Sequence, residues 1–276
     1  MNNHPSQQAR AIADEVKRRT SCSHYRMALN EERTPGITDS KIGGLPYWPS
    51  GKDYPVDERG EKMILLLQIN CAECHLRAPL PEQGMLQWYI STNPDYMYGC
   101  HGNNSTDGNG FRIIYHEIID GALAVKSGLP AHDSIEDWLT PVKREVSIDI
   151  IAEETSMGVS DMHFNDLFFD IVKTVAGSHK WYQYLENDDA VYFEQSLGMP
   201  EPCHQILGYP VCSQDDSRSK GTPQDTLLFQ LSSQFSAIDR DELVMWGDMG
   251  AGYIFINHED LEQREFSRAL YLWDCG

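Results

Sequence analysis

The sequence LLLQIN, residues 65–70, decides the fold, because a close variant of it returns later in the chain as LLFQL, residues 227–231. Two other segments recur in the same order and at nearly the same spacing. The first is IGGLP at 42–46, which returns as ILGYP at 206–210, and the second is GMLQWYI at 84–90, which returns as GAGYIFI at 250–256. Three ordered recurrences predict that the chain contains two copies of one unit.

Each recurring unit is predicted to be rich in β structure. A Gly/Pro turn opens it, since glycine tolerates positive φ and proline favours a tight bend. A short apolar strand follows and carries one glutamine, Gln68 or Gln230. A buried glutamine must hydrogen-bond its amide, which predicts a structural role. A second, aromatic-rich strand completes the unit. The predicted fold class is mainly β (α+β), with two tandem pseudo-repeats of a β-rich unit packed together with helical insertions.

Different material precedes and separates the two units. The first residues read as a polar amphipathic helix in which Ile12 and Val16 are spaced to touch a core. Between the units, residues 144–151 alternate like a strand, while 161–175 and 188–200 have the pattern of helices. The helix at 161–175 is expected to begin at a cap on Ser160 or Asp161. Four segments are therefore expected, namely an N-terminal helix and lead-in at 1–37, a β unit at about 42–125, an α/β insert at about 126–200 and a β unit at about 204–276. A single integrated domain over 38–276 is favoured.

The composition excludes several classes of function. The 276 residues carry a formal net charge of −20, which argues against nucleic acid or an anionic membrane surface as partner. The N-terminus has no apolar stretch of signal-peptide type, and the longest apolar runs are too short to span a bilayer. Seven cysteines, an odd number, fit reduced thiols better than a disulfide framework. We therefore expect a cytoplasmic protein.

The motifs in their order resemble those of a bacterial family of unknown function, the YwqG-like family. The resemblance covers roughly residues 38–276 and rests on seven segments: SKIGGLPYWPSGKDYP, LLLQIN, LPEQGMLQWYIS, HQILGYP, LLFQL, MWGDMGAGYIFI and FSRALYLWDCG. It implies a mostly-β architecture with helices packed around it, and no known reaction. The matching positions are Gly43, Gly44, Pro46, Gln68, His204, Gly208, Pro210, Trp246, Gly247, Asp248 and Cys275. Cys71 and Cys74 depart from the family pattern.

The pentapeptide Cys71-Ala72-Glu73-Cys74-His75 follows the first apolar strand and has three possible interpretations. Covalent haem attachment needs export from the cytoplasm, for which the chain shows no signal. A zinc site could use Cys71 and Cys74, with His75 or the later Cys100-His101 pair completing the four ligands. A redox pair would normally stand where a strand feeds a helix, which is not evident here. No cofactor is expected, and a zinc- or redox-responsive protein acting through Cys71 and Cys74 stays an alternative.

Candidate catalytic and binding residues gather in the family-matching turns. The chain lacks the G-x-S-x-G, H-E-x-x-H and kinase motifs. Asp248 and His204 are the best candidates for an acid and a base, although both fit structural roles in their turns. Tyr47, Trp48 and Trp246 are expected to be exposed beside these turns, where they could form a binding surface together with Asp248.

The predicted function is a non-catalytic, protein-binding module of the immunity or regulatory type. Turn glycines, strands and aromatic residues recur in the sequence, whereas no catalytic constellation does. The expected partner is another protein, and the acidic composition suits a basic one. An alternative is a hydrolase or small-ligand enzyme that uses a cleft between the two β units, with Asp248 and His204 in that cleft.

Overall fold

The computed structural model describes residues 5–100, 108–125, 127–131, 134–177, 184, 187–200 and 202–276. It is mostly β, with one nearly closed antiparallel sheet in the order β12-β11-β8-β7-β1-β6-β2-β3-β4-β5. The strands are β1 (Cys22–Asn30), β2 (Lys41–Ile42), β3 (Ile64–Asn70), β4 (Met85–Ile90), β5 (Phe111–His116), β6 (Val146–Thr155), β7 (Gln205–Ile206), β8 (Thr226–Ser232), β11 (Ala251–Ile256) and β12 (Leu270–Asp274). The mostly-β architecture expected from the sequence is confirmed.

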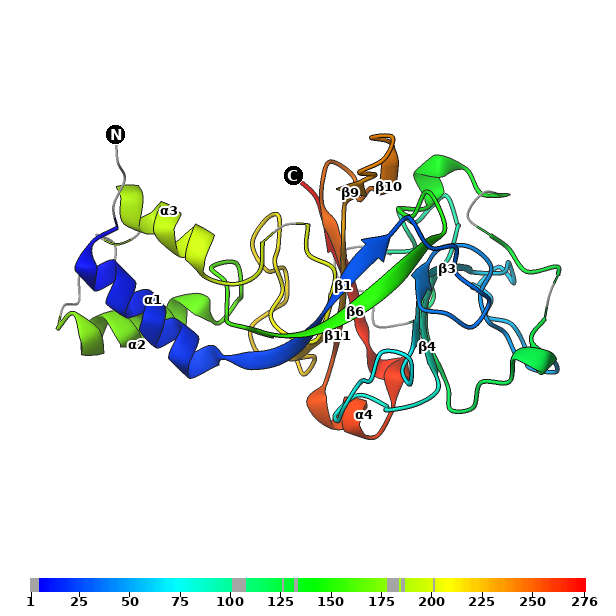
Figure 1. Ribbon diagram of the computed structural model, residues 1–276, viewed down its shortest axis with the longest axis horizontal. Coiled ribbons are helices and arrows are strands. Elements are labelled where there is room, and N and C mark those ends of the chain that lie inside the picture. The colour runs from blue at the N-terminus through cyan, green and yellow to red at the C-terminus, as the bar shows by residue number, and fades with distance from the viewer. Residues whose placement is uncertain are drawn as a thin grey trace.

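Two long strands, β1 and β6, lie in the middle of the sheet. They pair with each other along the whole length of β1, from Cys22 opposite Thr155 to Asn30 opposite Ser147. Figure 1 shows them side by side, running from the helices into the centre of the sheet. β1 comes from the segment that the sequence indicates only as a lead-in. Only His24, Tyr25 and Met27 in it are buried, and the sequence CSHYRMALN forms no long apolar run that would predict a strand.

A set of strands flanks this central pair on each side. We call β2-β3-β4-β5 the first arm and β7-β8-β11-β12 the second arm. In the first arm Ile42 lies opposite Leu67, and in the second Ile206 lies opposite Phe229. The pairing of β3 with β4 skips Leu66, and the pairing of β8 with β11 skips Leu228. The two arms therefore share strand order, direction and the position of a β-bulge.

The recurring glutamines fasten the turn of each arm to its strand. Gln68 is fully buried, and its Oε1 accepts hydrogen bonds from the Tyr47 backbone N–H at 2.8 Å and from Gln87 Nε2 at 2.8 Å. Gln230 is also fully buried, and its Oε1 accepts from the Val211 backbone N–H at 3.0 Å. The structural role predicted for both glutamines is confirmed.

Aromatic rings fill the space between the arms. Phe111 on edge strand β5 contacts Tyr271 on edge strand β12, with ring centroids 5.3 Å apart. Trp88 on β4 stacks on Trp246 at 5.9 Å, and Tyr271 meets Trp88 edge to face at 5.5 Å. All four rings are buried. The enzyme hypothesis predicts a cleft between the two β units. These buried rings fill the space between the arms at this level instead.

Three helices form a second apolar cluster at the far end of the central strands (Figure 1). Ser6 caps α1 by accepting from the Ala9 N–H at 3.0 Å, and Ile12 and Val16 are fully buried, as predicted. The second helix begins later than expected, because Asp161 bonds the His163 N–H in the turn before it. The helical elements are α1 (Gln7–Thr20), α2 (Phe164–Val175), α3 (Asn187–Ser196), α4 (His258–Glu262) and short 3-10 turns at η1 (Gly121–Leu123), η3 (Asp137–Leu139) and η5 (Phe266–Arg268). Within the described part of the chain, none of the helices has the length and apolarity to cross a membrane.

Candidate functional site

A cavity of about 420 Å³ lies beside a hairpin that projects from the second arm. The hairpin consists of β9 (Gln234–Phe235) and β10 (Glu242–Val244), and β9 follows β8 after a single residue. Figure 1 shows it in orange at the edge of the molecule. We call this cavity the hairpin pocket; its lining residues are Pro202, Ser232, Ser233, Gln234, Phe235, Ser236, Ala237, Arg240, Met249 and Gly250.

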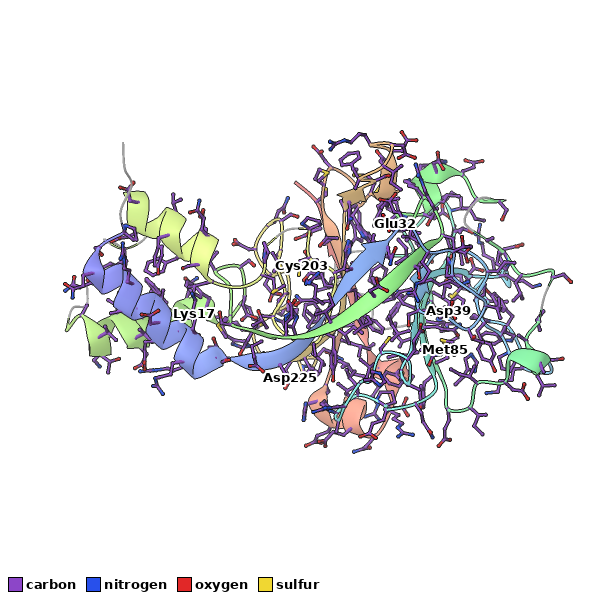
Figure 2. All side chains as sticks on the ribbon, viewed as in Figure 1. Lys17, Glu32, Asp39, Met85, Cys203 and Asp225 are labelled. Atoms are coloured by element: carbon purple, nitrogen blue, oxygen red, sulfur yellow. The ribbon has the colours of Figure 1, made fainter. Side chains whose placement is uncertain are left out.

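His204 stands behind the pocket and orients one of its lining residues. The Ser232 backbone N–H donates to His204 Nδ1 at 3.1 Å, so Nδ1 is an acceptor and Nε2 carries the proton. His204 Nε2 then donates to Gln234 Oε1 at 2.7 Å. Burial lowers the pKa of His204 to about 4, so the ring is neutral at pH 7. Because both ring nitrogens are engaged, His204 holds Gln234 in place and has no free nitrogen with which to act as a base. Figure 2 labels its neighbour Cys203, on the side of the sheet toward the helices.

The serine hydroxyls of the pocket are already committed to structural hydrogen bonds. Ser232 Oγ donates to the Cys203 carbonyl at 2.7 Å. Ser233 Oγ accepts the Trp246 backbone N–H at 2.8 Å, and Ser236 Oγ donates to Glu31 Oε2 at 2.6 Å. None of these three hydroxyls bonds His204 in the described chain, and the carboxylate that Ser236 Oγ bonds also accepts the Ala237 N–H. The arrangement offers a cavity that can hold a ligand.

The turn at 246–250 reaches the pocket through its last two residues. Met249 has a positive φ of 61° and is 49% exposed on the rim, and Gly250 lies next to it. Asp248 is exposed, and its backbone carbonyl accepts the Gly276 N–H at 2.9 Å. The fold therefore brings His204 and this turn to one pocket through Gln234 and Met249. It does not place the Asp248 carboxylate among the lining residues.

The exposure expected for Tyr47, Trp48 and Trp246 is wrong, since all three rings are buried. Trp48 packs edge to face on Tyr54 at 5.0 Å and donates from Nε1 to the Lys52 carbonyl at 2.9 Å. Trp246 stacks inside the core, as described above. The glycine-rich turns beside these residues curve back over the sheet, and large rings gain more free energy from burial there than from exposure.

Cys71, Cys74 and His75 lie together in sequence but not as a ligand set. Burial raises the pKa of both thiols to about 12, whereas zinc and redox chemistry use the thiolate. Cys74 Sγ lies 3.1 Å from Ser40 Oγ, and His75 is exposed. The described residues contain no group of three side chains able to hold a metal ion, and His101 lies outside them.

The residues that shape the pocket belong to no motif recognisable in the sequence. Phe235 is 46% exposed on the hairpin, and Arg240 also lines the cavity. The hairpin is fastened to the central strands by two charged groups, since Glu31 Oε1 accepts the Ala237 N–H at 3.0 Å and Arg144 pairs with Asp239 at 2.7 Å. The only signal in the sequence was an isolated phenylalanine in the polar segment SSQFSAIDRDE at 232–242.

Comparison with known proteins gives a family and no activity. The chain belongs to a family defined by a domain of unknown function, DUF1963, whose model matches residues 40–275. The matched region includes both arms, the hairpin pocket and β6, and it begins after β1. None of the curated proteins matches the chain.

Proposed function

We propose that this protein is a non-catalytic binding protein that holds a segment of another protein in the hairpin pocket. The observation that carries the proposal is the pocket itself, a cavity of about 420 Å³ with Phe235 and Met249 half exposed around it. A cavity of this size accommodates one large apolar group, and adjacent exposed apolar side chains are typical of interaction sites. The committed hydroxyls and the neutral, engaged His204 support binding in preference to turnover.

The acidic character of the chain supports a partner that is basic around its inserted segment. With a formal charge of −20, the protein attracts positively charged surfaces and repels other acidic proteins. An intracellular immunity or regulatory role, in which one protein captures another, fits this combination of an apolar pocket and an acidic chain.

The test compares variants of the pocket with a matched variant elsewhere. Met249→Glu places a charge on the rim, and Ile118→Glu makes the same change at a site that is 77% exposed outside the pocket. Affinity purification from the native host is expected to recover a stoichiometric protein with the wild type and with Ile118→Glu, and to lose it with Met249→Glu. Recovery that is absent at low and moderate salt, or unchanged by Met249→Glu, contradicts the proposal. Thermal melting of each variant separates lost binding from lost folding.

We also infer that the two arms are copies of one β unit. Equivalent backbone groups are bonded in the same way in both, since the Asn70 N–H donates to Ser40 Oγ at 3.0 Å where the Ser232 N–H donates to His204 Nδ1. The shared bulge and the paired glutamines support the same inference, as does the order of motifs typical of the YwqG-like family.

The cytoplasm is the compartment that we propose. Cys22, Cys71, Cys74, Cys212 and Cys275 are free thiols, and Cys71 is buried. Free thiols in this number are typical of proteins kept in a reducing compartment. Detection of the native protein in the soluble cell fraction with its thiols reduced tests this, and recovery from the culture medium contradicts it.

A further inference from the structure

We propose that the hairpin pocket recognises the C-terminal residue of its partner, with the apolar side chain in the cavity and the terminal carboxylate on Arg240 and Gln234; this rests on the proposed function. A C-terminal residue combines one apolar group with one carboxylate a few bonds away. The pocket offers an apolar wall and two hydrogen-bond donors on the same lining. This match of chemistry selects a chain end over an internal segment.

Arg240 places a positive charge beside the apolar cavity. It lies in the hairpin turn with a φ of 71° and lines the pocket. Its two acidic neighbours pair with Arg144 instead, Asp239 at 2.7 Å and Asp241 at 3.2 Å. The Arg240 guanidinium itself has no acidic partner among the residues that the structure describes. A guanidinium in this position can bind a carboxylate through two parallel hydrogen bonds.

Gln234 supplies a second donor whose direction is fixed. Its Oε1 is held by His204 Nε2 at 2.7 Å, and His204 is held in turn by the Ser232 N–H. The amide therefore presents its two N–H groups from the other side, and no described residue accepts from them. Among the lining side chains, Arg240 and Gln234 thus offer donors, while the three serine hydroxyls already have partners. Two donors without acceptors favour an anionic group over a peptide N–H.

The apolar wall sets the other half of the ligand. Pro202, Phe235, Ala237 and Met249 line the same cavity, which has room for a leucine- or phenylalanine-sized side chain. Methionine and phenylalanine on the rim adapt to side chains of slightly different shape. The site therefore fits a terminal residue with a large apolar side chain.

The experiment uses two small probes that differ only in the terminal group. N-acetyl-leucine carries the carboxylate, and N-acetyl-leucinamide replaces it with a neutral amide. Binding to the full chain is followed by NMR of carbon-13-labelled methionine methyl groups, with Met249 as the reporter. We expect the acid to bind about tenfold more tightly than the amide, which is the ratio produced by one charge-assisted contact of about 1.4 kcal/mol.

Two variants test the assigned residues. Arg240→Gln is expected to remove the preference for the acid, and the matched control Arg77→Gln, an exposed site outside the pocket, is expected to keep it. His204→Ala is expected to weaken the preference by releasing Gln234. An unchanged thermal midpoint of Arg240→Gln shows that the fold is intact.

The outcomes separate this inference from the proposed function. If acid and amide bind equally, the carboxylate assignment is overturned while capture of an apolar segment stands. If neither probe shifts Met249 at millimolar concentration, or if Arg240→Gln keeps the full preference, the inference is likewise overturned. An octanoate arm distinguishes the source of the carboxylate: octanoate binding more tightly than N-acetyl-leucine would assign the site to free fatty acids and overturn recognition of a protein chain end.

Discussion

The exits of β3 and β8 begin alike and then diverge. Directly after β3, the Cys71 N–H donates to the Gly84 carbonyl at 2.9 Å, and directly after β8, the Ser233 N–H donates to the Gly250 carbonyl at 2.8 Å. Beyond that bond the first exit forms the turn 71–75, in which Ala72, Glu73 and His75 are exposed, whereas the second continues into the hairpin. The first arm thus has a tight turn, which we call the closed exit, where the second arm has a hairpin with its pocket.

The side chain opposite each exit explains part of the difference. In the first arm Ser40 Oγ accepts the Asn70 N–H and lies against Cys74, so a short hydroxyl closes the site. In the second arm His204 accepts the equivalent N–H of Ser232, and its second nitrogen reaches one residue further out, to Gln234. Replacing a hydroxyl by an imidazole extends the hydrogen-bond chain from the core to the pocket.

The largest expected effect comes from breaking what the arms share. Gln68→Leu and Gln230→Leu each remove four hydrogen bonds from a buried site. Several backbone groups are then buried without partners, so we expect each variant to lose about 3–5 kcal/mol of unfolding free energy. Urea denaturation measures this loss. Gln83→Leu, at an exposed position, serves as the control, and a loss below about 1 kcal/mol in either arm contradicts the equivalence of the glutamines.

The next largest effect is on the pH dependence of the unfolding free energy, to which the second arm contributes through His204. Burial lowers the pKa of His204 to about 4, while an unfolded histidine titrates near 6.5. Between these values the unfolded chain binds a proton that the folded chain does not, so the unfolding free energy falls as the pH decreases through this window. His204 alone is expected to contribute about 2 kcal/mol of that loss between pH 7 and pH 5.

Two variants separate this contribution from that of His24 and His116, whose pKa values burial also lowers. Ser40→Ala leaves all three histidines in place and should keep the full pH dependence. His204→Ala should make the dependence clearly shallower, although it also destabilises the protein at pH 7. Equal slopes in the two variants, measured by denaturation at each pH, would show that the ring of His204 does not stay neutral in the fold.

A smaller effect is expected from loosening the hairpin. Glu31→Ala removes the bonds to Ser236 Oγ and to the Ala237 N–H and should cost about 1 kcal/mol. The loss should appear as faster hydrogen exchange at residues 234–242, because only the hairpin is released. Glu32→Ala changes the exposed neighbour, labelled in Figure 2, and should leave that exchange unchanged. Similar hydrogen exchange at residues 234–242 in the two variants would show that Glu31 does not hold the hairpin in place.

The smallest effect concerns the closed exit. Because burial raises the pKa of Cys71 and Cys74 to about 12, almost no thiolate is present at pH 7.5. We expect N-ethylmaleimide to modify these two thiols far more slowly in the folded protein than in urea, as read by mass spectrometry of peptides. Modification within minutes, or one equivalent of zinc bound on reconstitution, would indicate that the first exit is also open.

The sequence predicted the elements that depend on local pattern. The strands around Gln68 and Gln230 and the helix carrying Ile12 and Val16 follow from apolar periodicity and recurrence. β1 escaped prediction, because its burial depends on pairing with β6, more than a hundred residues away. Trp246 was misjudged because its burial depends on Gly252, where a Cβ would lie 2.4 Å from the indole ring.

The hairpin pocket could not be predicted from the local sequence pattern, for a related reason. Pattern indicated His204 and the turn at 246–250 as candidates, but their positions relative to each other depend on a third segment, 232–237, that links them. That segment is short, polar and weakly periodic, so nothing local predicts that it turns away from the sheet. A site assembled from three distant segments is visible only after the strands are placed.

β1 lies inside the sheet but outside the region that matches the family. β1 lies between β6 and β7 and is the strand that joins the first arm to the second, yet it stands before residue 40, where the family match begins. A chain cut to the shared region would keep every residue of both arms and lose the strand that makes them one sheet. The region shared with the family therefore covers both arms but not the strand that completes the sheet between them.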